Sequence, residues 1–169
     1  MYENDGLSAH LGIVSVEGYR APVTDLADFA RLAAEAGGLA VVVTTRADTT
    51  AQASLVSAGV ADNPLTGRAS AAFVVHGAAH KLVNIRRRPH TTVVASHGYE
   101  WATVEGPATI IGLDDPQPGF DEDAIRVLLR TVFTAAGGTH DNWDEYDRVM
   151  RADRRAAVFV EPARVYSNG

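Results

Sequence analysis

Hydrophobic positions recur at helical spacing in residues 25–36 and change to strand-like runs after residue 38. The apolar positions of the predicted helix are Leu26, Phe29, Ala30 and Leu32. Thr24 or Asp25 can cap this helix, and Gly37-Gly38 ends it. Runs rich in β-branched residues then predict strands over 39–45, 51–60 and 69–76. The polar residues 46–50 between the first two strands are typical of a hairpin connection.

The second half of the chain combines further strands with longer amphipathic helices. A short helix over 79–87 is followed by a hairpin of two strands, 91–96 and 101–111. Two more helices are predicted, one over 121–136 and one that begins at a cap formed by Asp141. A valine-rich sixth strand covers 156–166.

Hairpin-length connections between these strands predict a mainly β fold with peripheral helices. They favour a closed antiparallel barrel of six strands over a doubly wound parallel sheet. We expect residues 25–169 to form a single domain, and residues 1–24 to form an arm that is either loose or packed on a partner.

Composition narrows the possible functions. The chain has 169 residues and a formal charge of −6, which gives it no general attraction for nucleic acid or anionic membranes. It has no cysteine, so thiol nucleophiles and thiolate metal sites are excluded and any redox chemistry belongs to a bound cofactor. It shows neither a signal peptide nor an apolar run of membrane-spanning length, and we expect a cytoplasmic protein.

A basic segment within this acidic chain is the clearest chemical feature. Lys81 begins a predicted helix directly after a strand and a turn of small residues, Gly77-Ala78-Ala79, where backbone amides can approach a ligand closely. This arrangement predicts that Lys81 binds a phosphate. The three arginines at 86–88 are more typical of a solvated helix face. Phe73 is the only aromatic residue within ten positions of Lys81, which argues against nucleic acid.

The same segment resembles a known family. Phe73-Val74-Val75-His76, followed by Lys81, Asn84 and the run Arg86-Arg87-Arg88-Pro89, is similar to the strand–turn–helix of actinobacterial pyridoxamine-phosphate-oxidase-like proteins, many of which use the deazaflavin coenzyme F420. The likeness continues through residues 101–106, 134–141 and 164–166, and it covers roughly residues 25–168. The resemblance is judged from the order of these segments along the chain, because no single motif among them is specific.

The resemblance implies an FMN-binding split β-barrel that works as a homodimer, with the cofactor in a groove at the dimer interface. It places the ring system along the second strand and the phosphate near the third strand and the following helix. The cofactor-binding residues it implies are Gln52, Ala53, Ser54, Leu55, Val56, Val75, His76, His80, Lys81, Asn84 and Trp101.

Two departures from the family exclude vitamin B6 synthesis as the activity. Trp101 stands where the true oxidases have a polar cofactor-contacting residue. The C-terminal Arg-Arg-Pro-Pro stretch and tryptophan of those oxidases are also missing, because the chain ends Glu161-Pro162-Ala163-Arg164-Val165-Tyr166-Ser167-Asn168-Gly169.

The resemblance therefore implies an oxidoreductase in which reduced F420 passes a hydride to a small unsaturated organic substrate. FMN is the alternative cofactor, since it also offers a phosphate and a tricyclic ring, and the acidic tail of F420, which would suit Arg86 to Arg88, is the reason for preferring the deazaflavin. A non-catalytic binder of a flavin, haem or other planar ligand is the rival from another class, and a structural or regulatory dimer with an empty groove is a further one.

Other candidate residues carry weaker signals. His76 and His80 are separated by a turn, so a shared metal is not expected. His140 beside Asp141 could serve as a general acid or base, although a histidine next to a helix cap is the commoner case. Ser54 and Ser57 lack the Gly-x-Ser-x-Gly pattern of an activated nucleophile.

Overall fold

The computed structural model describes residues 25–168, so the predicted arm at residues 1–24 lies outside the described residues. The four helices of this region are α1 (Leu26–Glu35), α2 (His80–Arg87), α3 (Glu122–Ala135) and α4 (Trp143–Ala152). The strands are β1 (Leu39–Thr45), β2 (Ala51–Asp62), β3 (Ala69–Val75), β4 (His90–His97), β5 (Glu100–Gly112), β6 (Ala156–Val160) and β7 (Arg164–Ser167). None of the helices in residues 25–168 combines the length and apolar character needed to cross a bilayer.

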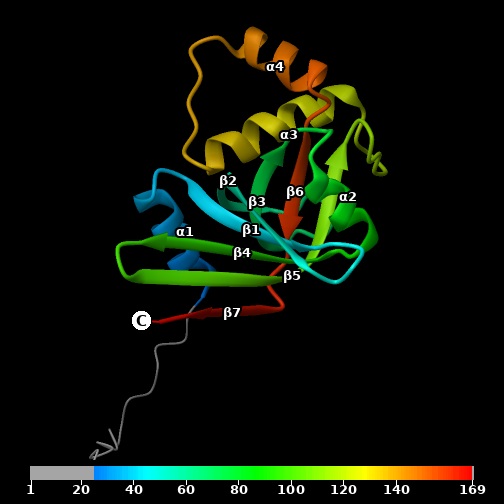
Figure 1. Cartoon of the computed structure of the whole chain (residues 1–169). Helices are drawn as coiled ribbons and strands as arrows, with labels where there is room; N and C mark the ends of the chain where they lie inside the picture. Colours follow the sequence, from blue (N-terminus) through cyan, green and yellow to red (C-terminus); the bar gives the residue numbers. More distant parts are fainter. Residues whose placement is uncertain (1–24, 169) are drawn as a thin grey trace, which may run out of the picture.

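Six of the strands form a closed antiparallel barrel, as the sequence predicted. Their order is β4-β1-β2-β3-β6-β5, and pairing of β5 with β4 closes the ring (Figure 1). Two long strands make this closure possible because each has two neighbours along its length. The first half of β2 pairs with β1 and the second half with β3, while β5 passes from β4 to β6 at Pro107 and Ala108.

The predicted single strand over 156–166 is wrong, because the chain forms two strands there. Glu161, Pro162 and Ala163 separate β6 from β7, and Pro162 has no N–H to continue a ladder. At this point the chain crosses β5, with Glu161 N–H donating to Pro107 O (3.0 Å) and Ala163 N–H donating to Glu105 O (2.8 Å). After the crossing, β7 pairs with the first half of β5.

The barrel interior is apolar and is covered at its ends by two helices. Phe29 and Leu32 of α1 and Leu82 and Ile85 of α2 are buried in one cluster with inward side chains of the strands, such as Val42. Helix α3 packs outside the barrel over β2, β3 and β6, and α4 lies on α3 (Figure 1). Between α3 and the barrel lies a second hydrophobic cluster, which includes Leu128, Leu129, Val132, Ala72 and Phe159.

Side-chain caps fix where α1, α3 and α4 begin. Asp25 caps α1 in a reciprocal capping box with Asp28, and Asp121 caps α3. The prediction that Asp141 caps the last helix is wrong. Asn142 occupies that position in an extended conformation, and its side chain accepts from the N–H of Glu145 (3.1 Å).

Gly106 is required at the crossing, because a Cβ there would lie 1.8 Å from Glu161 O. We predict that Gly106→Ala lowers the free energy of unfolding by about 3 kcal/mol, since the two strand backbones must separate. Chemical denaturation measures this value. The control is Gly98→Ala, where φ is +60° and nothing lies within 4 Å of a new Cβ, with an expected loss of about 1 kcal/mol. Equal losses would contradict the prediction.

Candidate functional site

A pocket of about 490 Å³ opens where β3 leads into α2. Its walls come from the ends of β1 and β3, the middle of β2, the start of α2, the end of α3 and one side of α4. Leu55, Val56, Val75, His76 and Lys81, all predicted from the sequence to contact a cofactor, lie on these walls. The fold therefore brings together the predicted phosphate end and part of the predicted ring-binding strand. Their binding role stays a prediction.

Four other predicted residues lie elsewhere on β2 and α2. The Asn84 amide donates to Gln52 Oε1 (2.7 Å) and to Thr44 Oγ1 (3.0 Å), so these side chains bind one another. Ala53 is exposed on the outside of the barrel. Ser54 shares the inner side of the sheet with Val42, and its Oγ is buried without a hydrogen-bond partner among residues 25–168.

The remaining two predicted residues are not on the pocket wall. His80 begins α2 and is exposed. Trp101 lies on the β4–β5 hairpin opposite Ser96 and packs edge-on against Tyr166, with ring centroids 5.9 Å apart. The structure thus places Trp101 with β7 and apart from the pocket-lining residues of β2.

Lys81 is the main electrostatic feature of the pocket. Its side chain is half-buried and has no hydrogen bond or ion pair within residues 25–168. Desolvation lowers the pKa of its ammonium group below the ordinary value. The start of the same helix also lacks a side-chain cap, because its N-cap residue is Ala79. An unpaired cation beside uncapped backbone amides is suited to bind an anion.

Two further basic side chains face the same space. His76 accepts from the N–H of Ala78 through Nδ1 (3.1 Å), and its Nε2 lies 3.8 Å from Asp153 Oδ1. Arg155 donates to Asp153 Oδ2 through Nε (3.1 Å) and Nη2 (3.0 Å), so one carboxylate orients both groups. Sequence reasoning missed Arg155. The basic run before β6 was the available signal, but nothing local places it beside Lys81.

The turn between β3 and α2 is fixed against the end of α4. Gly77 N–H donates to Asp153 O (3.1 Å), and a Cβ at Gly77 would lie 2.5 Å from Arg154 O. Only glycine permits this approach. Helix α4 therefore sets the position of the loop that carries His76 and leads to Lys81.

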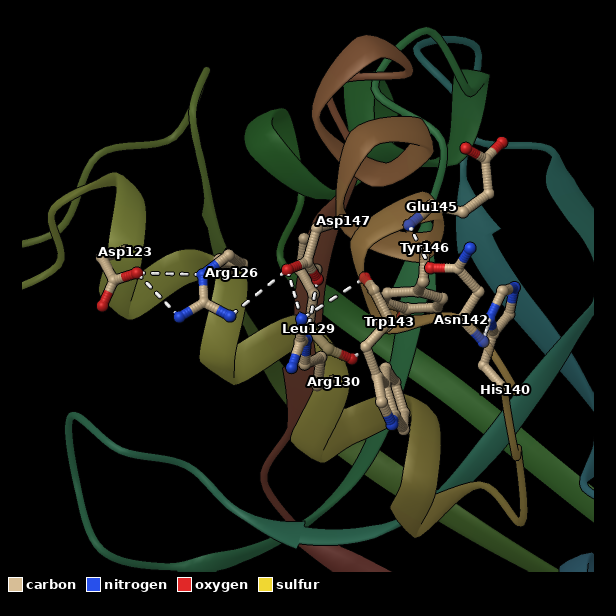
Figure 2. A network of polar contacts seen from close by, with 10 residues as sticks. All are labelled: Asp123, Arg126, Leu129, Arg130, His140, Asn142, Trp143, Glu145, Tyr146 and Asp147. Carbon is tan, nitrogen blue, oxygen red and sulfur yellow. Dashed lines mark hydrogen bonds and ion pairs between the residues drawn. The ribbon is translucent and has the colours of Figure 1, made fainter.

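An aromatic cluster forms the α3–α4 wall of the pocket. The rings of Phe133 and Tyr146 lie 4.9 Å apart, and Trp143 and His140 pack against Tyr146. Figure 2 shows Tyr146 donating to Leu129 O (3.2 Å). Burial raises the pKa of its phenol to about 12, so at neutral pH it can only be a proton donor or a neutral wall. His140 accepts from Asn142 N–H (3.1 Å), which gives it a structural role in the connection between the helices.

Arg86, Arg87 and Arg88 do not line the pocket. Arg86 forms two hydrogen bonds of 2.7 Å with Asp115, and Arg88 donates to Ala47 O (3.2 Å). Arg87 is exposed at the far end of α2. The sequence-based argument that these arginines hold an acidic tail therefore loses its support. Within residues 25–168, no group of three or more His, Cys, Asp or Glu residues is arranged to hold a metal ion.

The sequence matches no known protein-family profile. Solved structures nevertheless share its fold. A conserved hypothetical protein of Mycobacterium tuberculosis matches with a TM-score of 0.59 and 18% identity, over 86% of this chain and 84% of that one. An FMN-binding protein of Nostoc punctiforme related to pyridoxamine 5'-phosphate oxidase gives a TM-score of 0.51 and 12% identity, over 78% and 74%. An F420 reductase matches with a TM-score of 0.52 and 15% identity, over 76% of this chain and 88% of that one.

These likenesses establish the fold. The chain has the split β-barrel of the pyridoxamine-phosphate-oxidase-like proteins, as its sequence segments indicated. The three matches are at most 18% identical to it. Substrate and cofactor must therefore be argued from this chain's own residues.

Lys81 gives a prediction about the ligand-free protein. Lys81→Met keeps most of the aliphatic stem and removes a desolvated charge, so the free energy of unfolding at pH 7 should rise. Because the folded pKa is lowered, the unfolded chain binds more protons between that pKa and 10.5, and wild-type stability rises with pH across this window. The gap between wild type and variant should therefore close in alkali.

Denaturation curves across that pH range measure the Lys81 effect. Arg87→Met, at an exposed position on the same helix, serves as the control and should match wild type at every pH. A destabilised Lys81→Met protein at pH 7 would show instead that the ammonium group stabilises the empty pocket.

Tyr146 gives a prediction of opposite sign. In the folded protein the pKa of the Tyr146 phenol is raised to about 12. Its contribution to the free energy of unfolding is therefore complete below pH 10 and is lost as the pH rises through about 12. Wild type should lose about 2 kcal/mol relative to Tyr146→Phe over this window. Urea unfolding of both proteins at several alkaline pH values measures the difference. Tyr99→Phe, at a side chain that is 98% exposed, should follow wild type. If the stability of all three proteins changed in parallel with pH, the raised pKa of Tyr146 would be contradicted.

Proposed function

We propose that this protein is an oxidoreductase that uses reduced coenzyme F420 to transfer a hydride to a small unsaturated organic substrate. The observation that carries the proposal is the half-buried, unpaired ammonium group of Lys81 at the end of the pocket. Such a charge is costly to desolvate unless a ligand supplies the opposite charge.

The residues of the pocket fit a coenzyme with a phosphate and a planar ring. Lys81, His76 and Arg155 would hold the phosphate, while Leu55 and Val56 of β2 offer an apolar surface and backbone for the ring. The volume of about 490 Å³ falls within the range of about 300–1,000 Å³ typical of ligand pockets. When bound, the coenzyme supplies the carbon that carries the hydride.

The chain's own residues have the tasks of binding, orientation and exclusion of water. Correct distance and angle of transfer do not require a conventional catalytic side chain. Phe133 and the buried ring of Tyr146 keep one side of the pocket dry. The hydroxyl of Tyr146 is already used by Leu129 O, so it is a wall of the pocket and holds its proton at neutral pH.

We also propose that the active form is a homodimer. The outward side chains of β1 and β2 form an apolar surface beside the pocket, with Leu55 66% exposed and Leu39 52% exposed. Val41 lies opposite Leu55 on the same surface. A second copy would cover this surface and close the open side of the pocket.

FMN is the alternative cofactor, because its phosphate would suit Lys81 equally well and because Arg86 and Arg88 are already engaged in the structure. Haem is a second alternative, favoured by the position of His76 on the pocket wall. A haem storage protein of Vibrio cholerae shares the fold, with a TM-score of 0.51 and 9% identity over 80% of this chain and 89% of that one.

Separate titrations of the cofactor-free protein with F420, FMN and haem test the proposal. F420 should bind most tightly, and Lys81→Ala should weaken it by about 1.5–3 kcal/mol, the scale of a charge-assisted hydrogen bond. Fluorescence or calorimetry gives both values. Arg87→Ala, which removes one positive charge outside the pocket, should leave affinity unchanged.

The other results have definite meanings. Tighter binding of FMN or haem than of F420 would show that FMN or haem is the cofactor. Binding without hydride transfer to any substrate would identify a non-catalytic binder. Equal affinity of wild type and Lys81→Ala would remove Lys81 from the site.

A further inference from the structure

Lys81 differs from the other strongly basic residues of the chain. The chain has 15 lysine and arginine residues, and Lys81 is the only lysine among them. Arginine stays charged at any ordinary pH and contacts phosphate through a planar set of N–H donors, whereas the amine of lysine can lose its proton and act as a nucleophile. An arginine would also serve an ionic contact at this position, so what Lys81 alone brings is a side-chain amine.

The surroundings of Lys81 favour a free amine. Its side chain is half-buried and has no hydrogen bond or ion pair within residues 25–168. The described residues that line its pocket include no acidic residue, so no carboxylate there stabilises the charged form. Desolvation lowers the pKa of the ammonium group, and it therefore raises the fraction of neutral amine at a given pH above that of an exposed lysine. A small carbonyl compound that enters the pocket thus meets a nucleophile.

The other residues of this pocket define the kind of ligand that fits beside the amine. Arg155 donates to Asp153 through Nε (3.1 Å) and Nη2 (3.0 Å), which leaves its Nη1 without a hydrogen-bond partner in the described part of the chain. This group and His76 can hold an anionic substituent. Leu55 and Phe133 offer apolar contact on other walls. A compact molecule with an anionic group and an apolar body matches this lining.

We propose that Lys81 of the coenzyme-free protein forms a reversible imine with an aldehyde that carries an anionic group. The amine nitrogen attacks the carbonyl carbon, and the carbonyl oxygen leaves as water with the two amine protons. A C=N bond joins the ligand to Lys81, nothing is oxidised or reduced, and water reverses the step. The proposal does not depend on the proposed function. Because both use Lys81, the imine and the phosphate of the coenzyme exclude one another.

The experiment treats the coenzyme-free protein with para-formylphenyl phosphate and sodium cyanoborohydride, which reduces each imine to a stable amine. Mass spectrometry then locates and counts the adducts. The variant Arg87→Lys carries an exposed reference lysine at the far end of the same helix. At pH 7 the adduct at Lys81 should form roughly tenfold faster than the adduct at position 87, because the pocket holds the aldehyde beside the amine.

Matched controls test the class of ligand. Benzaldehyde lacks the anionic group and should react more slowly at Lys81, while phenyl phosphate, which lacks the aldehyde, should protect Lys81 but not position 87. Arg155→Gln should slow the reaction of the charged aldehyde several-fold and leave that of benzaldehyde unchanged. Arg164→Gln removes the same charge from an exposed position outside the pocket and should react as wild type does. Thermal unfolding checks that each variant is folded.

Each other outcome overturns a definite part of the account. Equal rates at Lys81 and at position 87 would overturn the proposal, and equal rates of both aldehydes at Lys81 would overturn its anionic ligand class. A protein that binds F420 but forms no adduct at Lys81 would overturn the imine alone. An adduct at Lys81 in a protein that binds no F420 would overturn the proposed function and leave the imine in place.

Discussion

Pairing of β4 with β5 closes the barrel, and the rest of the structure depends on that closure. It leaves each barrel strand with partners on both sides and encloses the apolar interior that α1 and α2 cover. Helix α2 can cover one end only if Leu82 and Ile85 point inward, and this orientation puts Lys81 at the half-buried start of the helix. The position of the candidate binding charge is therefore a consequence of barrel closure.

Polar contacts then hold the helix start that carries Lys81 from two directions. The Asn84 amide ties α2 to β1 and β2 through Thr44 and Gln52. On the other side, the Asp153 backbone and carboxylate hold Gly77 and Arg155. A site whose backbone is fixed before the ligand arrives loses less entropy on binding. The Asn84 and Gln52 side chains thus hold α2 against β2, and the cofactor contacts that the sequence resemblance implied for these two residues stay a prediction.

Patterns local in sequence predicted most of the fold, and contacts distant in sequence account for the errors. Hairpin-length connections and runs of β-branched residues indicated the six-stranded barrel, and the strand–turn–helix around Lys81 indicated part of the pocket. The break at Pro162 was missed because it reflects a crossing with Gly106 of another strand. Phe133 and Arg155 were missed because the packing of α3 on β2 and the contact of Gly77 with the end of α4 bring them to the pocket, and no local pattern encodes either contact.

The most direct test of the central claim is an experimental structure of the protein in complex with F420. The account predicts the phosphate of the coenzyme within hydrogen-bond distance of Lys81 Nζ, with its ring against Leu55 and Val56 of β2. A phosphate bound instead at Arg87, or a ring stacked on Trp101 away from β2, would contradict the account.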